Sequence, residues 1–200
     1  MKNFMKWKPI ERIGIVGMLA FILTFSACAQ TVKKADWRLQ KEAVLFHIKA
    51  DHKLNLYNGR EHTLYVCFYQ LNDAKSLERI AQDTKGIYKL LECGLFDESV
   101  ISSESNVIHA GENITLTFDR AEGAKFVAVV AGYSGTLSDE RVLRLYKIPT
   151  YKKCESFFKS NYRCVPCSME IQLMLGPNQI EHSKILESEL DCNDECEQQD

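Results

Sequence analysis

The sequence lacks any excess of basic residues. Its 200 residues include 25 Lys and Arg against 27 Asp and Glu, which gives a formal net charge of −2. Domains that bind nucleic acid concentrate positive charge on one surface, so this balance argues against a nucleic-acid partner. Long apolar runs are also scarce, because no stretch after the N-terminal region is long enough to span a bilayer.

Sequence motifs of catalysis are missing as well. The chain has no serine nucleophile elbow, no phosphate-binding glycine loop and no close pair of carboxylates within an apolar pattern. None of its five histidines is followed by another histidine four residues later, which is the spacing of a common helical zinc site. We therefore expect no catalytic residue, no cofactor, no histidine-bound metal and no enzymatic activity.

The first 28 residues have the organisation of a secretory signal. Four basic residues precede an apolar run at residues 13–25, and small residues follow it at Ser26 and Ala27. A basic start, a short apolar core and small residues before a cut are typical of a signal peptide. The sequence Phe-Ser-Ala-Cys that ends at Cys28 resembles a bacterial lipobox. The resemblance implies a signal at residues 1–27 and lipidation of Cys28; a transmembrane anchor or an ordinary signal with a chance cysteine are the alternatives.

Cleavage before Cys28 changes the charge of the chain. Residues 1–27 contain four of the 25 basic residues and one of the 27 acidic ones, so 21 and 26 remain and the net charge becomes −5. By analogy with bacterial lipoprotein sorting, Ala29 after the lipidated cysteine implies anchoring in the outer membrane, with the body in the periplasm. We expect residues 28–42 to be a polar tether and residues 183–200 to be an acidic, cysteine-containing tail.

Residues 43–182 carry the pattern of an all-β domain. Strands are expected at residues 43–50, 63–71, 113–119, 125–133, 142–148 and 169–175. Two of them, 63–71 and 125–133, are apolar on both faces, which suits strands that are covered on both sides. Residues 73–96 instead have helical periodicity with an interruption at Gly86. Strands separated by turns, with one helical insert, predict a β-sandwich.

Several segments of this domain occur in an order that is similar to a known family. They are LYVCFYQLN at residues 64–72, the end of the insert at 94–97, Ala-Gly-Glu at 110–112, FVAVVAGY at 126–133 and MEIQLMLGP at 169–177. In this order they resemble the outer-membrane lipoprotein of the type VI secretion system, the TssJ family. The resemblance implies a transthyretin-like β-sandwich with a short helical insert, and a structural role. It also implies a partner, the periplasmic domain of an inner-membrane protein of the TssM family, and a function in anchoring the secretion machine to the envelope.

The resemblance also implies where that partner binds. In the family, the loop between the first two strands is implicated in the contact, and here that loop is residues 51–62. It is polar, contains an Asn-Gly turn signal and is longer than a hairpin needs. The candidate contact residues are Asp51, His52, Lys53, Asn55, Tyr57, Asn58, Arg60 and His62. The helical insert is the next candidate surface.

Seven cysteines remain after Cys28, and an oxidising compartment favours disulfides. They are Cys67, Cys93, Cys154, Cys164, Cys167, Cys192 and Cys196. A bond between Cys67 and Cys93 would pin the helical insert to the sheet, but Cys67 could equally be a buried free thiol. The number is odd, so at least one thiol is free or pairs with another molecule.

The C-terminal cysteines leave a second function open. The insert at about residues 150–168 is an addition to the family pattern, and its Cys164 and Cys167 have the spacing of a redox pair. Together with Cys192 and Cys196 they could also hold zinc through four thiolates. Structural disulfides are the favoured interpretation, and the alternative is a periplasmic, lipid-anchored thiol-disulfide or zinc-binding protein.

Overall fold

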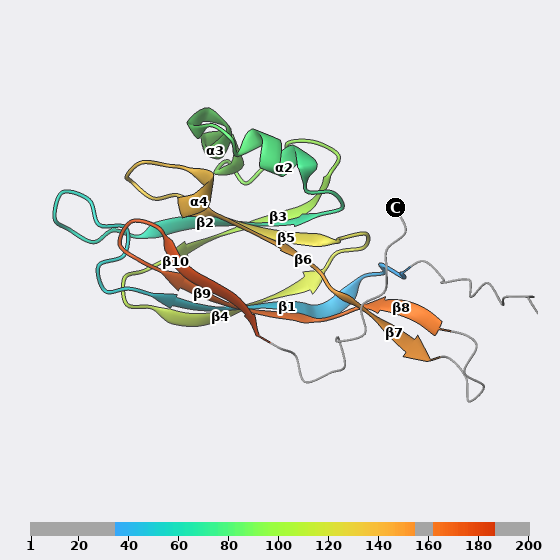
Figure 1. The fold of residues 1–200 in the computed structure, drawn as a ribbon. Helices are drawn as coiled ribbons and strands as arrows, with labels where there is room; N and C mark the ends of the chain where they lie inside the picture. The colour runs from blue at the N-terminus through green and yellow to red at the C-terminus, as the bar shows by residue number, and fades with distance from the viewer. Residues whose placement is uncertain (1–34, 155–161, 187–200) are drawn as a thin grey trace, which may run out of the picture. The chain divides into compact units, whose positions relative to one another are not determined.

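Two four-stranded sheets pack face to face in the computed structural model, which describes residues 35–154 and 162–186 (Figure 1). The first sheet has the order β10 (Ile180–Leu186), β9 (Met169–Leu175), β1 (Gln40–Ala50) and β4 (Asn113–Arg120). The second has the order β3 (Val100–Ile108), β2 (Leu64–Leu71), β5 (Phe126–Ala131) and β6 (Leu143–Lys147). The expected all-β sandwich is confirmed.

Strand β1 organises the first sheet. It pairs antiparallel with β4 and parallel with β9, so the last expected strand of the domain lies beside the first. Its alternating burial places Phe46 and Ile48 between the sheets, fully buried. Phe46 contacts Phe68 of β2, and Phe68 contacts Phe118 of β4, with ring centroids 5.0 Å and 5.2 Å apart. This aromatic cluster joins the two sheets.

The helical insert covers the outer face of the second sheet. It contains α2 (Lys75–Ile80) and α3 (Thr84–Leu90), which lie over β2, β3 and β5 in Figure 1. This explains why β2 and β5 are apolar on both faces. Gly86 does not interrupt the helix as expected. It lies inside α3, where a Cβ atom would be only 1.6 Å from the Ile80 carbonyl oxygen, so glycine permits the close approach of α2 and α3.

The break between the two helices instead lies just before α3. Asp83 is the N-cap of α3, and its side chain accepts a hydrogen bond of 2.7 Å from the Gly86 backbone nitrogen. A capping carboxylate satisfies one of the amide groups that a helix leaves without an internal partner. The expected insert is therefore two short helices separated by this cap.

Several elements have weak signals in the sequence. Strand β3 is rich in serine, β10 is polar, and α4 (Asp139–Val142) has four residues. The cysteine-rich insert contains a two-stranded hairpin of β7 (Thr150–Cys154) and β8 (Tyr162–Pro166). Because β10 continues to Leu186, the sheet extends four residues past the expected start of the tail at residue 183.

Parts of the expected organisation fall outside the described residues. These are the signal, Cys28, the tether up to residue 34, and the tail from residue 187, which includes Cys192 and Cys196. Within residues 35–154 and 162–186, no helix has the length and apolar character needed to cross a membrane.

Candidate partner-binding surface

The loop of residues 51–62 lies at the end of the sandwich opposite the tether. Strand β1 begins at Gln40, within the tether expected at residues 28–42, and ends at Ala50, where the loop begins. Eleven residues in a strand cover about 35 Å. Figure 1 shows the loop projecting beyond the sheets at one end, while the N-terminal segment enters at the other. The fold therefore places the start of β1 and this loop at opposite ends of the domain.

Asn55 supports the loop from inside and is not a surface residue. It is 5% exposed and has a positive φ of 48°. Its Nδ2 donates to the Thr63 carbonyl oxygen at 2.9 Å, and its Oδ1 accepts from the Ser134 backbone nitrogen at 2.7 Å. Leu54 beside it is fully buried. Asn55 is therefore removed from the expected contact residues, since its side chain holds the loop against the body of the domain.

The tip of the loop is a small hairpin. The backbone nitrogens of Tyr57 and Arg60 each donate to the other residue's carbonyl oxygen, at 2.9 Å and 3.1 Å. Asn58 and Gly59 between them have φ values of 51° and 75°. Two successive positive φ values are typical of the tight turn that Asn-Gly favours. The tip is thus a defined structure that presents Tyr57, which is 50% exposed, and the Arg60 side chain.

Most of the expected contact residues lie on the surface of this loop. The exposed ones are Asp51, His52, Lys53, Tyr57, Asn58, Arg60 and His62. Two neighbouring turns brace them. The Gly111 backbone nitrogen donates to the Asp51 carbonyl oxygen at 3.1 Å, and the Leu56 nitrogen donates to the Pro177 carbonyl oxygen at 2.7 Å. The loop therefore projects as a braced element and not as a free chain.

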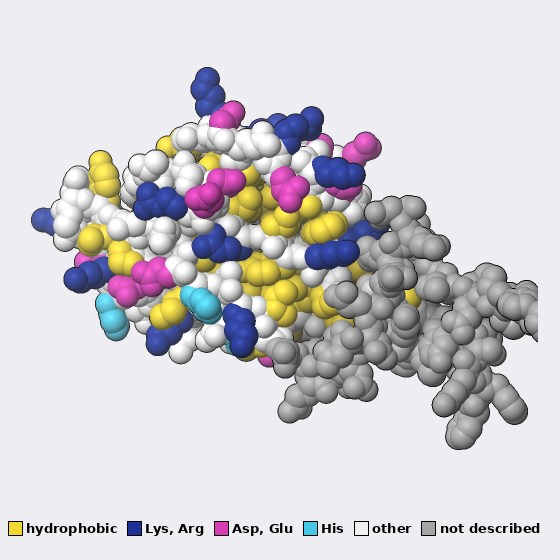
Figure 2. All heavy atoms as spheres, viewed as in Figure 1, with side chains coloured by type: hydrophobic (Ala, Val, Ile, Leu, Met, Phe, Trp, Pro, Cys, Tyr) yellow, Lys and Arg dark blue, Asp and Glu magenta, His cyan; other side chains and the backbone are white. Residues whose placement is uncertain are grey.

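Two exposed apolar side chains next to the loop were not expected from the sequence. Tyr65 of β2 and Val107 of β3 are cross-strand partners and are 40% and 46% exposed. They lie on the face that carries the helical insert, beyond the area that the helices cover. The sequence contains no signal for them, because residues 63–71 are apolar on both faces and β3 is rich in serine. Figure 2 shows hydrophobic side chains at the surface around this end of the molecule.

Four of the cysteines are in disulfides in the structure. Cys67 and Cys93 are bonded to each other, with Cα atoms 5.5 Å apart, so of the two possibilities that the sequence leaves open the structure has the disulfide and not the free thiol. Cys164 and Cys167 are both buried and disulfide-bonded. A sulfur in a disulfide offers no thiolate to a metal, and the part of the chain that the structure describes contains no metal-binding group of His, Cys, Asp and Glu. Structural disulfides are therefore the interpretation that the structure supports.

Comparison with models of known protein families shows which family the chain belongs to. The model of the family described as "Type VI secretion lipoprotein, VasD, EvfM, TssJ, VC_A0113" matches residues 42–178. The chain belongs to this family. The match covers β1 to β9, including the loop of residues 51–62. The family is a structural, membrane-bound lipoprotein family of the cell envelope and not an enzyme family.

Solved structures share the fold. The T6SS lipoprotein TssJ1 from Pseudomonas aeruginosa aligns with a TM-score of 0.54 and 14% identity, over 72% of this chain and 96% of that chain. Serratia marcescens Lip, a membrane-bound component of the type VI secretion system, aligns with a TM-score of 0.51 and 14% identity, over 72% and 97%. A chain of a structure described as the T6SS protein TssM C-terminal domain from EAEC aligns with a TM-score of 0.51 and 14% identity, over 72% of this chain and 98% of that chain. No curated protein sequence matches this chain significantly.

Proposed function

We propose that the protein is the outer-membrane lipoprotein of a type VI secretion membrane complex. In this proposal, lipid on Cys28 anchors it in the outer membrane, and the domain binds the periplasmic domain of an inner-membrane partner of the TssM family. Family membership supports the secretion role, and the likeness to a chain of the TssM structure supports the choice of partner. The protein acts as a structural link and performs no chemistry.

The observation that carries the proposal is the position of the loop. Its exposed residues are about 35 Å from the tether along β1. A lipid anchor at the tether end would hold that end near the outer membrane, so the loop would face the periplasm, from which an inner-membrane partner arrives. The exposed aromatic ring of Tyr57 and the Arg60 guanidinium at its tip are residue types enriched at the energetic centres of interfaces.

The test is the affinity of the purified protein for the partner's periplasmic domain. Replacing Tyr57 and Arg60 together by Ala should weaken binding at least tenfold, because both side chains would be buried in the contact. The matched control replaces Tyr88 and Lys89 by Ala; both are exposed on α3, and Tyr88 is 60% exposed. If the α3 variant loses affinity and the loop variant does not, the partner binds the helical insert and the loop assignment is wrong.

A further inference from the structure

The two lateral edges of the sandwich differ in how far side chains bridge the gap between the sheets. On one side, the Arg144 side chain of β6 spans to the other sheet, where it donates to the Ile180 carbonyl oxygen of β10. On the opposite side, β3 and β4 are the edge strands of the two sheets. Strand β3 has nine residues, contains no Lys or Pro, and pairs with no described strand other than β2. Lys and Pro are residues with which proteins protect an edge from pairing, and an inward-pointing charge has the same effect. In β3 that charge is Glu104, so the edge would accept an added strand that brings a cation to this carboxylate.

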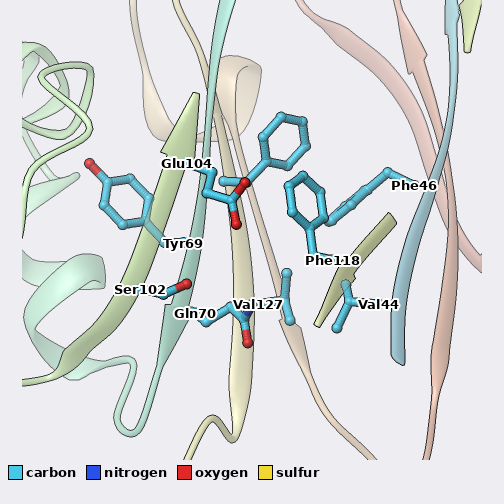
Figure 3. A pocket seen from close by; sticks show the side chains of 9 residues that line it. Val44, Phe46, Tyr69, Gln70, Ser102, Glu104, Phe118 and Val127 are labelled. Carbon is cyan, nitrogen blue, oxygen red and sulfur yellow. The ribbon is translucent and has the colours of Figure 1, made fainter. Parts of the chain in front are cut away.

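A small hollow opens between the sheets beside this edge. Its floor is apolar and includes Phe46, Phe68 and Phe118, while Ser102 and Glu104 of β3 lie along its rim (Figure 3). Its volume of about 10 Å³ is enough for one water molecule. An incoming side chain would therefore lie across the mouth and would not enter deeply. The floor suits an aliphatic stem, and the rim suits a polar tip.

Glu104 gives the hollow its charge. Its side chain is exposed and points toward the gap between the sheets in Figure 3. Among the described residues, no basic side chain forms an ion pair with it. A strand added alongside β3 would place the residue opposite Glu104 on the same face, toward the hollow. Lys or Arg at that position could extend its stem across Phe118 and its cation to the carboxylate.

The position of Glu104 disfavours a second copy of this chain as the occupant. Glu104 is the middle residue of β3. Antiparallel pairing of two β3 strands in full register would therefore place Glu104 directly opposite its own copy. Like charges in that position are destabilising. The charge instead favours a strand that carries a cation.

The free edge is continuous with the loop of residues 51–62. Strand β3 ends at Ile108, and three residues later Gly111 is hydrogen-bonded to Asp51. The exposed pair Tyr65 and Val107 lies on the outer face beside the same end of β3. A partner seated on the loop could therefore continue along β3 without leaving the surface.

We propose that an extended segment of the inner-membrane partner's periplasmic domain adds to the free edge of β3 and places a Lys or Arg beside Glu104. The identity of this partner rests on the proposed function above. Backbone hydrogen bonds along β3 would supply affinity, and the pairing with Glu104 would set the register. The loop and the strand edge are then two parts of one interface.

The experiment combines affinity with amide hydrogen exchange. The protein, purified in detergent with its lipid anchor, is mixed with the partner's purified periplasmic domain. Glu104→Lys should weaken binding about tenfold, because a favourable charge pair becomes a repulsive one. Glu122→Lys is the matched control, since Glu122 is an exposed acid in the turn between β4 and β5, and it should bind like wild type. The amides of residues 102–107 should exchange more slowly when the partner is bound.

The outcomes separate this proposal from the loop assignment. Loss of binding in the Tyr57 and Arg60 variant, with Glu104→Lys at wild-type affinity and no protection of β3, would overturn strand addition alone. Protection of β3 and weakening by Glu104→Lys, with the loop variant unaffected, would support strand addition and overturn the loop assignment. The β3 amides could also exchange slowly without any partner, and more slowly as the protein concentration rises. That result would overturn the proposal, because it would mean that a second copy of this chain pairs with β3. Absence of binding by the wild-type protein would overturn both proposals.

Discussion

Tyr69 joins the second sheet to the helical insert through one hydroxyl group. It is fully buried, and its hydroxyl donates to the Leu90 carbonyl oxygen at 2.5 Å. Leu90 ends α3, and its carbonyl oxygen, which the helix itself leaves unpaired, accepts a second bond of 3.2 Å from the Cys93 backbone nitrogen. The ring also packs edge-on against Phe96, with centroids 5.7 Å apart. Burial, the largest cause, raises the pKa of Tyr69 to about 12.

Tyr69→Phe should lower the free energy of unfolding by about 1 kcal/mol, because one buried hydrogen bond is lost while the Leu90 carbonyl keeps its bond from the Cys93 backbone nitrogen. The substitution should also change how the free energy of unfolding depends on pH above pH 10. Between pH 10 and 12 the unfolded chain loses the Tyr69 proton while the native protein keeps it, so stability falls as the pH rises. Denaturant titrations across this range should show a shallower decline in the variant. An unchanged slope would contradict the assignment.

Arg120 is a buried cation at the tether end of the sandwich. It is 3% exposed, its Nη2 donates to the Arg38 carbonyl oxygen at 2.8 Å, and its guanidinium lies 5.8 Å from the centre of the Trp37 ring. Its Nε and Nη1 have no hydrogen-bond partner among the residues that the structure describes. Burial lowers the pKa of Arg120. Removing an incompletely paired buried charge and keeping its volume is often nearly neutral, so we assign Arg120 to holding the tether and not to stability.

Arg120→Met should therefore change the free energy of unfolding by less than about 1 kcal/mol, yet release Trp37. The chain has two tryptophans, and Trp7 lies in the expected signal, so Trp37 is the fluorescence reporter of the mature protein. Its emission should shift to longer wavelength in the variant, and cleavage near Arg38 by trypsin should become faster. Wild-type emission together with a large loss of stability would show that Arg120 supports the core and not the tether.

At the scale of elements, the disulfide fixes the helical insert to the sheet. Cys67 lies in β2, and Cys93 follows α3 with a positive φ of 52°. The bond closes a segment with a sequence separation of 26. The Ser103 hydroxyl donates to the Cys93 carbonyl oxygen at 2.7 Å, which adds a link from β3. The insert is thus held at its far end by two different strands.

Replacing Cys67 and Cys93 together by Ala should lower the free energy of unfolding by about 3 kcal/mol, from the added freedom of the unfolded chain. The loss should be uneven across the domain, because only the insert loses a local restraint. Amide exchange should rise most in α2 and α3 and least in β1 and β9. A uniform rise over both sheets would mean that the bond stabilises the whole sandwich and does not act on the insert.

The sequence predicts those elements whose pattern is local. The apolar runs of β2 and β5, the alternation of β1 and β4, and the helical insert all follow from nearby residues. Strand β3 has Ser102, Ser103 and Ser105 near its centre, so it carries little strand signal, and only pairing with β2 makes it a strand. Asn55 and Asn58 look alike in sequence, yet one is buried and the other exposed. That difference depends on Ser134, 79 residues away.

For the whole molecule, the central feature of the proposed function is that the expected tether and the loop proposed to bind the partner lie at opposite ends of β1. The tether enters beside Gln40, and the loop of residues 51–62 projects after Ala50. A protein built this way can connect a membrane at one end to a partner at the other. The exposed side chains at the loop tip are not among the buried core residues, so they can be replaced without loss of the fold.

The most direct measurement is the distribution of the inner-membrane partner between the two membranes after their separation on a density gradient. With the wild-type protein, part of the partner should sediment with the outer membrane. Cys28→Ser should release the protein from the outer membrane, and the partner should then be found only with the inner membrane. The variant with Ala at Tyr57 and Arg60 should stay in the outer membrane and still lose the partner. A distribution of the partner that is the same in all three strains would contradict the account.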